Sequence, residues 1–268
     1  MPIHPTALVD ARAAVHPDAD IGPFVVVDGS VRIGARTRVL AHATLMGWTE
    51  IGADNTIHSG AVIGDTPQDL AFTGAETYLR IGDRNVIREH VQIHRGTKAG
   101  SATVIGNDNF FMATSHVGHN CSVGNHVIIT NGAMLGGYVV VEDQAIVSGN
   151  CAVHQFVRIG RLAMLRGLSK TSRDVPPFCV MDGTHTVRAI NRVGLRRAGF
   201  SPAQIRALQS AFMVLFGRAR NLRMALAELE SEPVSAEVRY LIDFTRASKR
   251  GVCFGTRPQG GRMVNGEW

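Results

Sequence analysis

An aliphatic or aromatic residue recurs at every sixth position of this chain, and this repeat limits the folds that the chain can adopt. The register runs without a break from Ile3 to Ile63. It resumes at Ile81 and, after a second interruption, continues from Ile105 to Leu165. A helix requires apolar residues three and four positions apart, and an amphipathic strand requires one at every second position. The strict period of six therefore predicts short strands, joined by tight corners and stacked into a parallel β-helix.

The other positions of each hexad support this interpretation. Glycine often follows the aliphatic residue, and a small or β-branched residue stands four positions after it. We expect one large and one small side chain to point inward from each strand, and the glycines to permit the corner backbone.

The pattern resembles the hexapeptide-repeat family. That resemblance implies an all-β left-handed parallel β-helix, a hexapeptide-repeat solenoid with three hexads (18 residues) per coil, although parallel crossovers are normally right-handed. We expect residues 1–185 to form about nine coils at the spacing of parallel strands, as the catalytic domain.

The repeat ends after residues 175–177, and the rest of the chain has helical signals. Ser201, Pro202 and Gln204 form the start signal of a helix, and further helices are expected over 224–230 and after Ser235. We expect a C-terminal α-helical domain over 186–250 and a disordered tail over 251–268. Arginines gather in the helical part, either as a solvated face or as a docking surface for an acidic protein or a phosphate.

The bulk composition excludes several classes of protein. Apolar residues make up 45% of the chain and charged residues 19%, which predicts a buried core. No apolar run is long enough for an integral membrane span. The first residues lack the pattern of a signal peptide and the four cysteines form no CxxC pair, so we expect a cytoplasmic protein. The net charge of +6 predicts an anionic partner, but nucleic acid is disfavoured because the basic region lacks interleaved aromatic residues.

One group of polar residues suggests acyl transfer. With 18 residues per coil, His119, Gly137 and Gln155 share one column on the outer surface, and His154 lies in the neighbouring column. His119 is a candidate general base, because imidazole titrates near neutral pH. The backbone N–H of Gly137 is a candidate donor to a developing oxyanion.

Other interpretations of these residues stay open. A histidine on a β-helix can be a surface residue without function, and the chain could be a solenoid that only binds. Cys121 and Cys151 occupy inward positions, where a thiol is an inert filler rather than a nucleophile. A zinc site would need histidine pairs such as His90 with His94, and no acidic or histidine partner completes such a pair in the same column.

Several longer motifs resemble one family within the hexapeptide-repeat proteins. They are Gln68-Asp69-Leu70, residues 81–85, 93–97 and 153–156, His116-Val117-Gly118-His119, and residues 174–177. In this order they resemble the acyl-carrier-protein-dependent UDP-N-acetylglucosamine O-acyltransferases of lipid A synthesis. The resemblance covers nearly the whole chain.

The resemblance implies transfer of a (3-hydroxy)acyl chain from acyl carrier protein to the sugar 3-hydroxyl of UDP-N-acetylglucosamine. It also implies a homotrimer with sites between subunits, no metal, no cofactor and no covalent intermediate. The implied roles are as follows: His119 is the general base and Gly137 the oxyanion donor; Gln68, Asp69, His116, His154, Gln155, Asn191 and Arg197 bind substrate; and Gly167 limits acyl length, admitting a longer chain because it lacks a side chain.

Some positions depart from the family pattern. Ala71 replaces a lysine, Tyr138 a histidine, Val193 a glutamate and Ala198 an arginine. Because these positions lie near the acceptor, a UDP-sugar with an amine in place of the hydroxyl stays open as an alternative acceptor.

Overall fold

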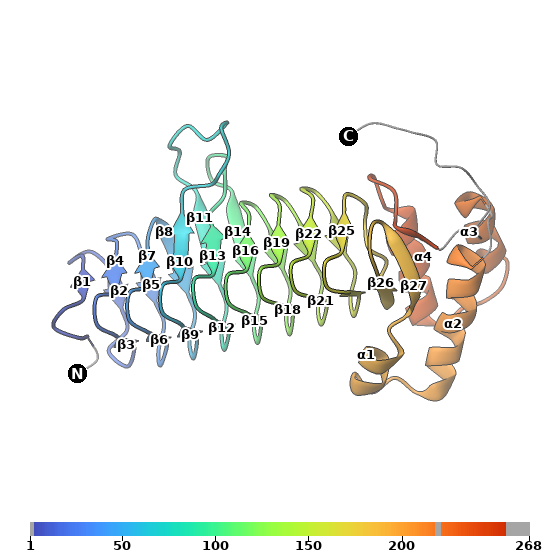
Figure 1. Cartoon of the computed structure of the whole chain (residues 1–268), viewed down its shortest axis with the longest axis horizontal. Helices are drawn as coiled ribbons and strands as arrows, with labels where there is room; N and C mark the ends of the chain where they lie inside the picture. Colours follow the sequence, from blue (N-terminus) through green and yellow to red (C-terminus); the bar gives the residue numbers. More distant parts are fainter. Residues whose placement is uncertain (1–2, 218–220, 256–268) are drawn as a thin grey trace.

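The strands of this chain form three sheets, which are the three sides of an elongated prism (Figure 1); their strands pair in parallel, except for one antiparallel pair near the C-terminal end. The computed structural model describes residues 3–217 and 221–255. The first side is the nine-stranded sheet, with strands β1 (Leu8–Val9), β4 (Val26–Val27), β7 (Thr44–Leu45), β10 (Val62–Asp65), β13 (Gln92–His94), β16 (His116–Val117), β19 (Met134–Leu135), β22 (Ala152–Val153) and β25 (Lys170–Thr171).

The second side is the eight-stranded sheet, with strands β2 (Ala14–Val15), β5 (Arg32–Ile33), β8 (Trp48–Ile51), β11 (Tyr78–Ile81), β14 (Ala102–Ile105), β17 (Ser122–Val123), β20 (Val140–Val141) and β23 (Arg158–Ile159). The third side is the eleven-stranded sheet, with strands β3 (Asp20–Ile21), β6 (Arg38–Val39), β9 (Thr56–Ile57), β12 (Val86–Ile87), β15 (Phe110–Phe111), β18 (Ile128–Ile129), β21 (Ile146–Val147), β24 (Met164–Leu165), β26 (Cys179–Met181), β27 (Thr186–Ile190) and β28 (Phe254–Gly255). The expected left-handed parallel β-helix is confirmed.

The hexad pattern produces the core as expected. From Ile21 onward the recurring aliphatic residues are buried, as Ile57 and Leu135 illustrate with no exposed area. The small residues four positions later are buried as well, including Ala133 and Cys151. Residues 18 positions apart pair directly in regular coils, for example Leu135 with Val153. Each coil therefore buries its apolar side chains against the coils above and below it.

The expected role of the repeated glycines is only partly right. The left-handed corner conformation falls three positions after the aliphatic residue, and residues such as Asp54, Asn120 and Tyr138 adopt it. Most glycines that directly follow the aliphatic residue serve close packing between coils instead. A Cβ on Gly34, for example, would stand 2.6 Å from the backbone of the next coil. Side chains are excluded there by the neighbouring backbone and not by the φ angle.

Two segments leave the regular coil where the hexad register lapses. One connects β10 to β11 and the other connects β13 to β14. Both project from the same side of the prism (Figure 1). The first carries Gln68 and Asp69, so this insertion brings polar side chains to an otherwise repetitive surface.

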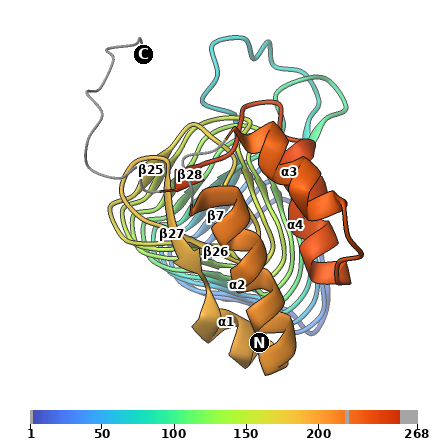
Figure 2. The ribbon, with the colours of Figure 1, turned by 90° about the vertical axis from the view of Figure 1, so that its right-hand side faces the viewer.

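Four helices lie across the C-terminal end of the prism (Figure 2). They are α1 (Arg192–Arg197), α2 (Pro202–Phe216), α3 (Leu222–Glu230) and α4 (Ala236–Arg246). The predicted start of α2 is confirmed, because Ser201 and Gln204 form a reciprocal capping box. Ser235 caps α4, as its position before the apolar pattern predicted.

The beginning of the expected disordered tail is structured, which corrects the prediction for residues 251–255. Phe254 and Gly255 form β28, which pairs with β27, and Val252 pairs with Asp174. The buried Cys253 fixes this segment against the last coil, a long-range contact that the local composition does not reveal. The remainder of that tail, 256–268, lies outside the described residues. None of the described helices is long and apolar enough to cross a membrane.

Candidate active site

A surface pocket of about 340 Å³ lies at the corner between the nine-stranded and eight-stranded sheets. Its lining consists of Gln68, His94, His116, Gly118, His119, Gly136, Gly137, His154 and Gln155. The register of β16, β19 and β22 places His119, Gly137 and Gln155 on three successive coils. The column expected from the sequence is therefore present, and the insertion after β10 covers it with Gln68.

His119 is held at the centre of this pocket by two polar neighbours. Its side chain is nearly buried, with 9% of the residue exposed. Nδ1 lies 3.0 Å from Oδ1 of Asn120, and Nε2 lies 3.6 Å from Oδ2 of Asp69. The Asp69 carboxylate reaches this position from the insertion, where its Oδ1 accepts a hydrogen bond from the backbone N–H of Ala71.

Asn120 determines which nitrogen of His119 carries the proton. Its Oδ1 also accepts the backbone N–H of Thr97 at 3.0 Å, which identifies this atom as the carbonyl oxygen of the amide. An oxygen can only accept, so Nδ1 of His119 carries the hydrogen in the neutral ring. The lone pair of Nε2 then faces Asp69 and the pocket, as a general base requires.

Gly137 lies directly against the imidazole ring of His119. A Cβ at Gly137 would stand 2.5 Å from both Cε1 and Nε2 of that ring, so any side chain at this position would force the His119 ring to move. Among the described residues, no acceptor is placed for the N–H of Gly137. The pocket therefore combines a basic nitrogen with an unused backbone donor beside it.

His94 and His116 form a desolvated pair on one wall of the pocket. Their ring centroids are 5.1 Å apart. Burial, with a smaller effect from the neighbouring His94 and His119, lowers the pKa of His116 to about 4. Burial also lowers the pKa of His94, whose Nδ1 donates to the carbonyl of Thr66 at 2.7 Å. Nε2 of His94 is buried and has no partner among the described residues, so it can accept a hydrogen bond from a substrate.

Aromatic residues extend the wall beyond His119. Tyr138 meets the His119 ring edge-on, with centroids 5.3 Å apart. Phe156, one coil further, stacks on Tyr138 at 4.8 Å. Tyr138 stands where the family pattern has a histidine. Its ring packs between His119 and Phe156 and does not titrate near neutral pH as an imidazole does.

The insertion that carries Gln68 and Asp69 is anchored by a buried arginine. Arg95 is 8% exposed and lies over the rings of Trp48 and Phe72, at 5.8 and 5.5 Å from their centroids. Its Nη1 donates to the carbonyl of Gly64 at 2.9 Å. Because Phe72 belongs to the insertion, this stack holds the insertion against the coils.

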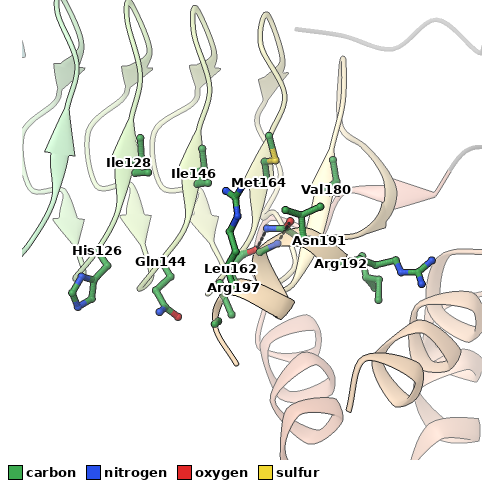
Figure 3. A pocket seen from close by; sticks show the side chains of 14 residues that line it. His126, Ile128, Gln144, Ile146, Leu162, Met164, Val180, Asn191, Arg192 and Arg197 are labelled. Atoms are coloured by element: carbon green, nitrogen blue, oxygen red, sulfur yellow. Dashed lines mark hydrogen bonds between the residues drawn. The ribbon is translucent and has the colours of Figure 1, made fainter. Parts of the chain in front are cut away.

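Two of the predicted substrate-binding residues lie elsewhere in this chain. Asn191 and Arg197 line a different cavity of about 700 Å³ between α1 and the outer face of β18, β21 and β24 (Figure 3). The Asn191 amide is buried, donating to the carbonyl of Leu162 and accepting from the N–H of Gly194 to cap α1. Gly167 also lies outside the His119 pocket, at the corner between β24 and β25.

Sequence reasoning missed several residues that contact the predicted site. Asn120 follows His119 directly in the sequence, and this adjacency to the predicted base could have identified it as a candidate partner of the imidazole. His94 belongs to a quoted motif, but only contact with the pocket identifies its role. Arg250 had no local signal: its Nη2 lies 3.4 Å from Nδ1 of His154, although 96 positions separate the two residues.

The structure also bears on the zinc alternative. Within residues 3–217 and 221–255, no group of three or more histidine, cysteine, aspartate or glutamate side chains is arranged to hold a metal ion.

Comparison with protein families defines the class of this molecule. Residues 30–65 and 102–137 match the model of the bacterial transferase hexapeptide, and residues 174–253 match domain 2 of UDP-N-acetylglucosamine O-acyltransferase. Together with the pocket geometry, these matches define an acyltransferase of the hexapeptide-repeat class.

Relatives and solved structures identify the family. The acyl-[acyl-carrier-protein]–UDP-N-acetylglucosamine O-acyltransferase of Gloeothece citriformis is 44% identical over 92% of this chain and 90% of its own length. The protein of the same name from Thermodesulfovibrio yellowstonii is 42% identical over 94% and 98%. A UDP-N-acetylglucosamine acyltransferase structure from Bacteroides fragilis is 40% identical, has a TM-score of 0.90 and covers 93% of this chain and 99% of its own. The chain belongs to the family of acyl-[acyl-carrier-protein]–UDP-N-acetylglucosamine O-acyltransferases.

Proposed function

We propose that this protein transfers a (3-hydroxy)acyl chain from acyl carrier protein to the 3-hydroxyl of UDP-N-acetylglucosamine, the first step of lipid A biosynthesis. The observation that carries the proposal is the contact between His119 and Gly137. A basic nitrogen and an unpaired backbone N–H meet in one pocket, which is the combination that acyl transfer to a hydroxyl requires.

The proposed reaction needs no group beyond the two substrates. Nε2 of His119 takes the proton of the sugar hydroxyl while the hydroxyl oxygen attacks the thioester carbon. The N–H of Gly137 donates to the oxyanion that forms. The carbon–sulfur bond then breaks, and the leaving sulfur takes the proton from His119. The products are the sugar ester and the free thiol of the carrier, and His119 returns to its neutral state.

Asp69 and Asn120 support the charge that develops on His119 in this reaction. When Nε2 is protonated, the Asp69 carboxylate 3.6 Å away stabilises the imidazolium. Asn120 keeps the ring in the required tautomer.

A covalent route through cysteine is not supported. Cys121 and Cys151 are buried, and burial raises the pKa of Cys121 to about 12. A thiol of this kind is neither exposed nor ionised at neutral pH.

The remaining pocket residues have roles in substrate binding. Gln68 and Asp69 approach His119 from the insertion and face the acceptor sugar. His116 stays neutral at physiological pH and provides a hydrogen-bonding ring without a charge. His154 and Gln155 line the pocket on the coil beyond Gly137 and face the acyl donor.

We further propose that the protein works as a homotrimer in the cytoplasm. Asn191 and Arg197 lie on a different face from His119, so both sets can contact one nucleotide sugar only if a second copy supplies one of them. The outer face beside Asn191 carries Ile128, Ile146 and Met164, in keeping with the apolar core of a contact between identical subunits. The four cysteines are all free, in keeping with a reducing compartment.

An acceptor assay tests the proposal. Purified protein is incubated with 3-hydroxyacyl carrier protein and either UDP-N-acetylglucosamine or its 3-amino analogue, and the acylated sugar is quantified. We expect acylation of the hydroxyl sugar, with a loss of about 10² to 10⁴ in kcat for His119→Ala. Preference for the amine would replace the proposed acceptor. No transfer to either sugar, or turnover unaffected by His119→Ala, would reject the mechanism.

A further inference from the structure

The imidazole of His119 has a hydrogen bond at one end only. Nδ1 lies 3.0 Å from Oδ1 of Asn120, whereas Nε2 lies 3.6 Å from Oδ2 of Asp69, which is beyond the length of a hydrogen bond. Among the described residues, no other group forms a hydrogen bond with this ring. A ring that is fixed at one nitrogen can still turn about that contact, so packing has to determine where Nε2 points.

Tyr138 supplies this packing from the next coil. It follows Gly137 at the corner after β19, and its backbone N–H donates to the carbonyl of His119 at 2.9 Å. Its ring meets the imidazole edge-on, with centroids 5.3 Å apart and an angle of 89° between the two planes. The edge-on arrangement is a favoured geometry for two aromatic rings. Both the backbone and the side chain of Tyr138 therefore contact the residue that carries the base.

The ring of Tyr138 is held in turn by Phe156, one coil further on. The two rings stack with centroids 4.8 Å apart and an angle of 14° between their planes. The backbone N–H of Phe156 donates to the carbonyl of Gly137 at 3.0 Å, so the ladder that joins His119 to Tyr138 continues to this coil. Phe156 is nevertheless 49% exposed, so its ring supports Tyr138 without contributing to the core.

The contact with His119 does not depend on the phenol hydroxyl. Within the described part of the chain, the side chain of Tyr138 has ring contacts with His119 and Phe156 and no hydrogen bond. Phenylalanine can therefore take over this contact, whereas a residue without a ring cannot.

Titratable and charged groups also face His119 from other elements. They are Asp69 on the insertion, His94 on β13, His116 on β16, and His154 after β22, whose Nδ1 lies 3.4 Å from Nη2 of Arg250. Burial lowers the pKa of both His94 and His116, which keeps these two rings neutral near pH 7. A phenol is also uncharged at this pH. Tyr138 thus contacts the base without adding a charge to this group.

We propose that Tyr138, backed by Phe156, is a positioning residue that holds the imidazole of His119 with Nε2 toward the acceptor hydroxyl. This inference rests on the proposed function, because the orientation matters only if His119 is the base. The ring acts through its shape, since it blocks rotation of the imidazole about the contact with Asn120. It also acts through its lack of charge, since a cation 5.3 Å away opposes the positive charge that His119 takes on with the proton.

Replacement of the ring tests its shape. Tyr138→Phe should keep the wild-type kcat for acyl transfer, because the hydroxyl has no partner to lose. Tyr138→Leu should lower kcat by about tenfold to a hundredfold, the cost of a base displaced by about 1 Å. KM for UDP-N-acetylglucosamine should change less than kcat, because Tyr138 acts on the base and not on the sugar. Both replacements fit this corner, since Leu162 and Phe156 adopt the same conformation with φ of 56° and 66°.

Introduction of a second imidazole tests the charge. Tyr138→His places a titratable ring beside the base, and His42 and His90 show that histidine adopts this corner conformation. Protonation of either imidazole then opposes protonation of the other, so the two rings titrate as a coupled pair. The acid limb of kcat/KM against pH should become shallower than in wild type and extend over about one additional pH unit. Tyr138→Phe should keep the wild-type limb.

Phe24 provides the matched control. It occupies an equivalent corner with a φ of 57°, and its ring stacks on His42 with centroids 5.0 Å apart. This corner joins β3 to β4 near the N-terminal end of the prism, away from the candidate site (Figure 1). Phe24→Leu and Phe24→His should keep the wild-type kcat and pH profile. Phe156→Leu removes the support of Tyr138 and should show part of the loss in kcat that Tyr138→Leu shows.

The possible outcomes separate this inference from the proposed function. Wild-type kcat in Tyr138→Leu, with activity lost in His119→Ala, overturns the positioning role and leaves the reaction intact. An unchanged acid limb in Tyr138→His also overturns it, and this variant keeps a planar ring if Tyr138→Leu lowers the thermal unfolding midpoint. A loss confined to KM for either substrate assigns Tyr138 and Phe156 to substrate binding, which contradicts the inference. Absence of transfer by the wild-type protein rejects the proposed function itself.

Discussion

The imidazole of His119 lies on the backbone of Gly137, with space for a hydrogen at Gly137 but not for a methyl group. The 2.5 Å separation between an added Cβ and Nε2 is about 1 Å shorter than a normal carbon–nitrogen contact. Neighbouring coils of the β-helix create this contact, because the two residues are 18 positions apart and their strands pair in register. Base and oxyanion donor are thus positioned by the repeat itself.

Gly137→Ala should abolish most of the activity while leaving the fold intact. The added methyl displaces the His119 ring by about 1 Å, and a misplacement of this size costs about 10²-fold in rate. The measurement is kcat for acyl transfer together with the thermal unfolding midpoint. Gly149→Ala is the control, because a Cβ there meets its nearest neighbour at 3.4 Å. Equal activity in the two variants would argue against a contact between base and oxyanion site.

Asn120→Asp should retain activity within a few-fold, and Asn120→Gly should lose about tenfold in kcat. Aspartate keeps an acceptor for Nδ1 of His119 and for the N–H of Thr97, whereas glycine removes it. Both replacements tolerate the φ of 59° at this position, so the backbone is not strained. The measurement is kcat of the two variants at the same pH, so that the difference reports the loss of the side-chain acceptor. If the glycine variant is as active as the aspartate variant, Asn120 does not orient the base.

Arg95→Lys should raise KM for the nucleotide sugar by about tenfold, with a smaller effect on kcat. Lysine cannot reproduce a planar group that lies over the rings of both Trp48 and Phe72, and each lost cation–π contact is worth about 1–2 kcal/mol when desolvated. The insertion that carries Gln68 and Asp69 then becomes more mobile, so limited proteolysis within residues 66–77 should accelerate. Arg80→Lys, at the exposed Arg80, is the control. Unchanged KM and unchanged cleavage would show that the insertion does not depend on Arg95.

Acid should destabilise the protein through His116. In the unfolded chain this histidine binds a proton below about pH 6.5, but in the folded protein only below about pH 4. The unfolded state therefore holds more protons between these values, and the free energy of unfolding falls as pH decreases from 6.5 to 4, by at most about 3 kcal/mol. Urea unfolding of wild type and His116→Asn at pH 7 and pH 4.5 measures the effect.

The His116→Asn variant should lose part of this pH dependence, and His4→Asn, at an exposed residue of the first coil, should retain all of it. His94 and His185 have pKa values lowered in the same direction and explain a remaining slope. An identical slope in wild type and His116→Asn would contradict the assignment.

Gly167→Met should shift the preferred acyl donor towards shorter chains if this position limits acyl length. A Cβ at Gly167 would meet only the carbonyl oxygen of Gly149, at 3.5 Å, so a side chain can be added there without disturbing the coil. The measurement is kcat/KM for carrier proteins with acyl chains of increasing length. An unchanged length profile would remove Gly167 from the acyl site.

The sequence alone was sufficient for the solenoid and for part of the candidate site. In a β-helix each coil stacks on the one before it, so a fixed sequence separation becomes a fixed separation in space. For this reason the period of six identified the buried residues, and the 18-residue coil placed His119 beside Gly137. The same reasoning was only partly right at the corners, where glycines were expected to supply positive φ but residues such as Asn120 and Tyr138 more often do so. The repeat shows which residues are buried. It does not show that most of its glycines are needed because the backbone of the next coil lies too close for a side chain.

Only the tertiary structure decided the positions of residues outside the repeat. Asp69 lies near His119 because the insertion folds back over the coils, and Arg250 reaches His154 because its segment is pinned to Asp174. Asn191 and Arg197 lie on another face, where the chain leaves the last coil and enters α1. These positions depend on long-range packing and hydrogen bonds, which have no periodic signal in the sequence. The repeat determined the base and the backbone donor, and the non-repetitive segments determined what surrounds them.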